Sequence, residues 1–178
     1  FLKRKEAASL AAACAERDSA IVADEVFADF GLSEDPAGRH PSFALDSPAL
    51  SFSLGGLSKS CALPQMKVGW IAISGPPAPR DEALVRLEFI ADTYLSAGTP
   101  VQLAARKLLA LRHEMQQQIR ARTEANYVYL LESCRAQQEG KVLLREAGWY
   151  AILKISPEIS EEELAVDLLQ RDEVFVHP

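Results

Sequence analysis

A lysine loop between two apolar strands constrains this chain more than any other stretch. Residues 50–54 and 70–74 alternate large apolar with small side chains, and both runs predict strands. The loop between them carries Lys59 and, eight residues later, Lys67. Two glycines free the backbone just ahead of Lys59, the hydroxyl of Ser58 stands beside it, and most neighbours are apolar. An amine that is kept from water in this way is a nucleophile, so Lys59 is the catalytic candidate.

The lysine loop reads Gly-Leu-Ser-Lys at 56–59 and Leu-Pro-x-x-Lys-x-Gly-Trp at 63–70. These residues resemble the signature of class I and II aminotransferases. Enzymes of that family have the fold called type I and use pyridoxal 5'-phosphate (PLP). The resemblance implies that Lys59 holds PLP as an imine, and that Lys67 and Ser58 bind the cofactor phosphate. Lys67 stands where the family normally has arginine, and so lacks the two-pronged hydrogen bonding of a guanidinium group. Gln65 also departs from the signature, which prefers a small residue there.

A carboxylate follows the first predicted strand. Residues 19–24 read as a short buried strand that ends in Asp24, and the carboxyl ends of parallel strands are where such sheets bind ligands. Taken alone, Asp24 could equally be a helix cap or a solvated loop charge. The resemblance implies that it pairs with the pyridine nitrogen of PLP. Phe27 occupies the position of a tyrosine that donates to the cofactor's phenolic oxygen, and so contributes no hydroxyl.

The order of the predicted elements indicates an α/β fold. An alanine-rich helix over residues 3–17 precedes the first strand, as in parallel α/β proteins. The resemblance implies that residues 1–100 form the second half of the large PLP domain, with a mostly parallel sheet and flanking helices. Residues 101–138 then form a long connecting helix, kinked or acting as a connector between domains. Residues 139–178 begin a small α+β domain, and the chain is expected to be a fragment of a longer protein.

Local signals predict the remaining elements. A proline-rich stretch at 75–79 leads into a helix expected from about residue 82 to 94, and a helix capped near Ser160 is expected later. Strands are predicted at 141–144, 149–155 and 174–176. Gly148-Trp149-Tyr150 resembles the glycine-aromatic strand start that edges the substrate entrance of these enzymes, although the same residues in a core strand need no such role.

Composition limits the classes of function. With 178 residues, 48% hydrophobic and 25% charged, the chain has an ordinary globular composition. A net charge of -6 argues against nucleic-acid binding through this segment. No apolar run approaches the roughly 20 residues of a membrane span, and a cytoplasmic location is expected. The three cysteines and three histidines are scattered without metal-ligand spacing, so no metal site is assigned.

The resemblance implies transamination between an α-amino acid and a 2-oxo acid, in a protein that is a homodimer when full length. Three other readings stay open. The same scaffold serves PLP-dependent lyases, decarboxylases and acyl-transferring synthases. Aminotransferase-like domains also sense ligands in transcription regulators. Finally, the segment by itself could bind no cofactor, because the family's substrate-carboxylate arginine and several ring contacts lie outside these residues.

Overall fold

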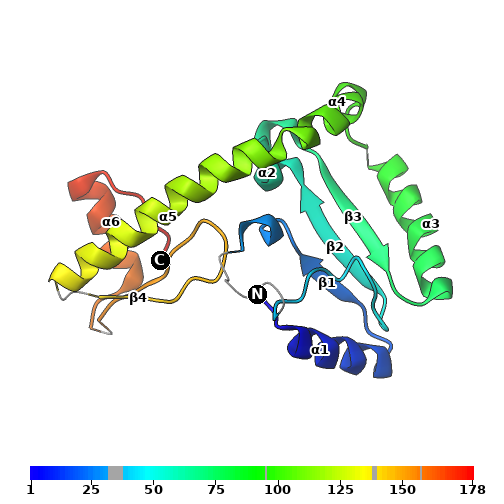
Figure 1. Cartoon of the computed structure of the whole chain (residues 1–178), viewed down its shortest axis with the longest axis horizontal. Helices are drawn as coiled ribbons and strands as arrows, with labels where there is room; N and C mark the ends of the chain where they lie inside the picture. The colour runs from blue at the N-terminus through cyan, green and yellow to red at the C-terminus, as the bar shows by residue number, and fades with distance from the viewer. Residues whose placement is uncertain (32–37, 95, 138–139, 157) are drawn as a thin grey trace. The chain divides into compact units, whose positions relative to one another are not determined.

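The computed structural model describes residues 1–31, 38–94, 96–137, 140–156 and 158–178. Contacts divide the chain into two compact units (Figure 1). The first unit comprises residues 1–122 and 146–149, and the second comprises residues 123–145 and 150–178. The expected boundaries after residues 100 and 138 stay predictions.

A three-stranded sheet organises the first unit, with strand order β1-β2-β3 (Figure 1). β1 is parallel to β2, and β2 is antiparallel to β3. The expected strands, helix and lysine loop of this part of the chain are therefore present. In chain order the elements are α1 (Arg4–Glu16), β1 (Ile21–Asp24), η1 (Ala28–Phe30), β2 (Ser51–Gly56), α2 (Leu57–Ser60), η2 (Pro64–Met66), β3 (Gly69–Ser74), α3 (Pro77–Thr93), α4 (Thr99–Ala110) and the first part of α5 (Arg112–Gln137).

Small residues allow α1 to pack closely on the sheet. Ala7 and Ala11 of α1 are buried against Ile21 of β1, together with Phe43 and Ala49 from the segment before β2. Because side chains alternate across a strand, Val22 of β1 points to the other face, where it is 68% exposed. This buried cluster therefore lies on the α1 side of the sheet.

The lysine loop is anchored by Leu57, whose side chain is fully buried. Its backbone nitrogen donates to the oxygen of Val68 at 3.0 Å, and its oxygen accepts from the nitrogens of Cys61 and Leu63, each at 3.1 Å. The first residue of α2 thus fixes both ends of the loop that carries Lys59.

We expect Leu57→Ala to lower the free energy of unfolding by about 2–5 kcal/mol, because it leaves a cavity where a leucine was fully buried. Chemical denaturation followed by tryptophan fluorescence measures this loss. Leu84→Ala is the matched control, since Leu84 is 49% exposed. Equal losses in the two variants would contradict the anchoring role of Leu57.

The structure corrects the start of one predicted helix and divides another. α3 begins at Pro77 rather than near residue 82, because prolines are tolerated in the first turn, where backbone N–H groups have no intrahelical partner. The long helical run is two helices, α4 and α5, with Leu111 between them. It is therefore interrupted, as its length suggested.

The second unit is built from short elements. β4 (Lys141–Val142) pairs antiparallel with β5 (Leu153–Lys154), and α6 (Glu161–Asp172) follows. Ser160 caps α6 as predicted, because its Oγ accepts from the nitrogen of Glu163 at 3.4 Å. The predicted strands at 141–144 and 149–155 were too long, and the one at 174–176 is absent from the described chain. A strand needs a hydrogen-bonded neighbour, and the nitrogen of Val174 instead donates to the oxygen of Leu168 at the end of α6.

Candidate functional site

The parallel pairing of β1 and β2 brings the predicted site residues to one edge of the sheet. Asp24, the last residue of β1, pairs in register with Leu54 of β2. Two residues further on, β2 ends and the chain turns into α2, which carries Ser58 and Lys59. The carboxyl ends of two neighbouring parallel strands therefore meet where the sequence predicts catalysis.

Two aromatic rings flank the amine of Lys59. Its Nζ lies 5.7 Å from the ring centroid of Phe27 and 5.5 Å from that of Trp149. Both distances fit a cation–π attraction. The side chain is half-buried, and no carboxylate pairs with it anywhere in the described ranges. Lys59 is thus a lysine held among rings rather than in a salt bridge.

The position of Trp149 depends on the glycine before it. Gly148 is buried with φ +80°, a backbone conformation that favours glycine, and its nitrogen donates to the oxygen of Phe30 at 3.0 Å. The indole then packs edge-on against Phe30, with ring centroids 5.1 Å apart, and against Phe27 at 5.4 Å. The sequence placed Trp149 at the start of a strand, but β5 begins only at Leu153. Its place is beside Lys59.

The buried indole nitrogen of Trp149 has no acceptor within the described part of the chain. A buried donor without a partner is costly, and such groups in native proteins call for an explanation. This one belongs to a ring that contacts Lys59.

Asp24 and Lys67 are exposed and contact neither each other nor Lys59 through any hydrogen bond or ion pair that the described residues make. Oδ1 of Asp24 accepts from the nitrogen of Val26 at 3.2 Å, a local turn contact. Lys67 follows η2 in a left-handed conformation, with φ 51°, just before β3 begins. The roles that the resemblance implies for Asp24, Phe27, Ser58, Lys59 and Lys67 stay predictions.

Sequence reasoning missed the neighbour of Asp24. Glu25 accepts three hydrogen bonds: from the nitrogen of Phe43 at 2.8 Å, from Ser42 Oγ at 2.6 Å and from Ser53 Oγ at 3.3 Å. These bonds tie the end of β1 to β2 and to the segment before it, beside a pocket of about 220 Å³. Strand alternation could have indicated this role, because it places Glu25 on the face of the sheet opposite to that of Asp24.

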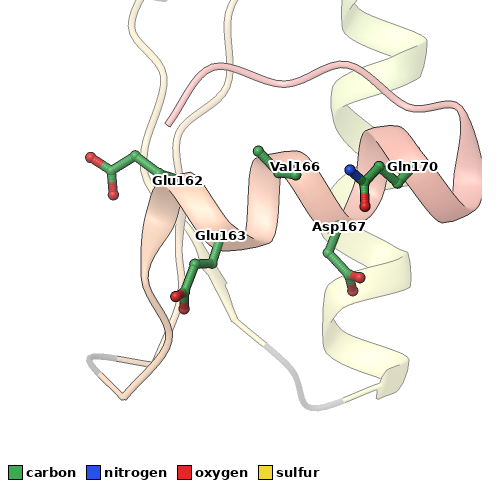
Figure 2. A pocket seen from close by; sticks show the side chains of 5 residues that line it. All are labelled: Glu162, Glu163, Val166, Asp167 and Gln170. Atoms are coloured by element: carbon green, nitrogen blue, oxygen red, sulfur yellow. The ribbon is translucent and has the colours of Figure 1, made fainter.

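Two further hollows among the described residues lie in the second unit. One has a volume of about 300 Å³ and is lined by five residues of α6: Glu162, Glu163, Val166, Asp167 and Gln170. Figure 2 shows these side chains along the helix. Among the described residues, no group of three or more histidine, cysteine and acidic side chains gathers as metal ligands. None of the described helices is both long and apolar enough to cross a membrane.

The family profile described as "Aminotransferase class I and II" matches residues 1–178, the whole chain. The chain belongs to this family. No curated protein matches this aminotransferase chain significantly. The family's cofactor is pyridoxal 5'-phosphate, as the sequence resemblance implied.

Solved structures share the fold of this aminotransferase chain. Tyrosine aminotransferase from Leishmania infantum matches with a TM-score of 0.84 and 22% identity over 99% of this chain. A PLP-dependent aminotransferase from Streptococcus suis gives 0.78 and 23%, and an aromatic aminotransferase from Pyrococcus horikoshii gives 0.77 and 20%, each over 100% of this chain. The matched regions cover 44%, 45% and 47% of the Leishmania, Streptococcus and Pyrococcus chains. The chain therefore spans less than half the length of these structures.

The residues present suit PLP by their chemistry. The cofactor needs an amine to attach to, cations and hydroxyls for its phosphate, a carboxylate for its ring nitrogen and donors for its phenolic oxygen. Lys59, Ser58, Lys67 and Asp24 offer the first three kinds of group around one edge of the sheet. The indole N–H of Trp149, which has no acceptor among the described residues, is a further donor in a ring that flanks the amine.

Proposed function

We propose that this chain carries the lysine portion of a PLP site that transfers an amino group from an α-amino acid to a 2-oxo acid. One observation supports this most directly. The amine of Lys59 stands at the carboxyl edge of two parallel strands, between two aromatic rings and without an ion-pair partner in the described residues. A lysine free of salt bridges and partly shielded from water is suited to nucleophilic attack on a carbonyl.

Each side chain has a part in this proposal. The amine of Lys59 would hold the cofactor at its aldehyde carbon, and as a free amine it would move a proton to and from the substrate α-carbon. The carboxylate of Asp24 would pair with the protonated ring nitrogen of the cofactor. Lys67 and Ser58 would hold the phosphate. When bound, PLP supplies an electron sink for the bond that breaks at the α-carbon.

We further propose that the protein carrying this chain acts as a homodimer on amino acid and 2-oxo acid substrates. The length comparison supports the idea that other segments complete the site, since the matched solved structures are more than twice as long. The rings of Phe27 and Trp149 would border the space next to the amine.

The test is an absorbance spectrum of the protein with PLP, followed by borohydride reduction and peptide mapping. We expect a visible absorption band and a stable pyridoxyl group on Lys59. Adding an amino acid should then bleach the band and produce the matching 2-oxo acid. Release of carbon dioxide or ammonia instead would favour a decarboxylase or a lyase, and binding without turnover would favour a sensor. Label scattered over surface lysines would contradict the proposal.

A further inference from the structure

One buried glutamine of α5 bridges the two segments that carry Phe27 and Lys59. Gln116 is only 6% exposed. Its Nε2 donates to Oδ2 of Asp29 at 2.9 Å and to the backbone oxygen of Ser60 at 3.0 Å. All three residues belong to the first unit. A single amide group thus uses both of its hydrogens to join segments that are distant in sequence.

The two acceptors stand next to the candidate site. Ser60 directly follows Lys59 in α2, and Asp29 lies in η1, two residues after Phe27. The amide of Gln116 therefore ties the backbone behind the lysine to the segment behind the ring that faces its amine. Lys59 Nζ lies 5.7 Å from the centroid of the Phe27 ring, and the Gln116 amide joins the two segments that carry these residues.

Further contacts reinforce the same junction. The guanidinium group of Arg120, one helical turn after Gln116, donates to the backbone oxygen of Asp29. Ser60 Oγ donates to the oxygen of Gly56 at 2.7 Å, and Cys61 Sγ lies 3.6 Å from the oxygen of Leu108 in α4. Polar contacts from α4 and α5 therefore hold α2, the short helix that carries Lys59.

Burial of this amide would be unfavourable without its acceptors. Gln116 stands in a run of three glutamines, and its neighbours Gln117 and Gln118 are exposed. A buried amide is stable only when its hydrogen bonds are made, and here both donors are used. An apolar residue would fill the same space without making either bond.

We infer that Gln116 is a positioning residue, which sets the placement of the Lys59 amine against Phe27 through Asp29 and Ser60. The inference rests on the proposed function for its consequence in cofactor binding. The effect of Gln116 on the placement of Lys59 is independent of the proposed function, because all residues of the bridge belong to this chain.

The first test measures the accessibility of Lys59 without cofactor. Competitive acetylation with acetic anhydride and peptide mapping give the reactivity of Lys59 relative to the exposed Lys107. We expect Gln116→Leu to raise this ratio severalfold, because the loosened α2 lets the amine leave the rings. Gln117→Leu, a matched change at the adjacent exposed position, should leave it unchanged.

The second test measures PLP affinity by absorbance. Gln116→Leu should weaken binding about tenfold, as expected when a buried acceptor loses its donor. Gln116→Glu should also weaken it, since a carboxylate cannot donate to Asp29. Asp29→Asn in the Gln116→Glu background restores a donor–acceptor pair and should recover part of the affinity.

The outcomes separate the two proposals. A lower melting temperature in Gln116→Leu, with Lys59 acetylation and PLP affinity equal to those of Gln117→Leu, would overturn the inference and leave Gln116 a packing residue. A double variant no better than Gln116→Glu would contradict the bridge to Asp29. If the unaltered protein takes no PLP on Lys59, the proposed function fails, whereas the acetylation comparison still decides the role of Gln116.

Discussion

Lys59→Arg is expected to abolish covalent attachment of PLP and to lower transaminase activity by about 10²- to 10⁴-fold, because the proton-transferring amine is lost. Arginine keeps the positive charge that lies 5.7 Å and 5.5 Å from the Phe27 and Trp149 ring centroids, so the local packing should survive. It cannot attack an aldehyde or shuttle a proton near neutral pH, because its guanidinium group stays protonated. Borohydride reduction and peptide mapping measure the attachment, and 2-oxo acid formation measures the activity.

Lys107→Arg supplies the control, since Lys107 is exposed on α4 and belongs to no proposed site. It should retain both the label and the activity. If the Lys59→Arg variant still carries a pyridoxyl group on another lysine, Lys59 is not the residue that attaches PLP. A melting temperature close to that of the unaltered protein would show that the loss reflects chemistry rather than unfolding.

Lys67→Ala is expected to weaken PLP affinity about 10- to 100-fold, because a hydrogen bond to a charged group contributes about 1.5–3 kcal/mol. Lys67 is exposed, and so the alanine variant should leave the free energy of unfolding nearly unchanged. Titration of the visible absorption with PLP measures the affinity.

Lys67→Arg tests the same contact in the opposite direction. A guanidinium group can bind a phosphate with two parallel hydrogen bonds, so this variant should bind PLP at least as tightly as the unaltered protein. Pyridoxal without the phosphate serves as the matched ligand, because its binding should not distinguish the unaltered protein from Lys67→Ala. Unchanged PLP affinity in Lys67→Ala would remove Lys67 from the site.

Much of the fold was predictable because it follows from local chemistry. Alternation of side chains placed β2 and β3 near their observed bounds, a short buried run placed β1, and the loop between β2 and β3 fell where expected. Ser160 was recognised as a cap because a hydroxyl ahead of a helix accepts from its first turn. The predicted strand lengths in the second unit were wrong, because pairing decides where a strand ends and the sequence does not show which segments pair.

The candidate site was likewise only partly predictable from the sequence. The sequence alone made Lys59, its neighbour Ser58 and the carboxylate at the end of β1 the candidates, because motif spacing and the order of predicted elements are local properties, and their roles stay predictions. Only the tertiary structure placed Trp149 over the lysine amine, made Glu25 a half-buried acceptor and selected Gln116 from three consecutive glutamines. Gln116 reaches Asp29 across 87 positions of sequence and Ser60 across 56. Such contacts depend on how helices pack against loops, and burial then determines which polar groups must be paired.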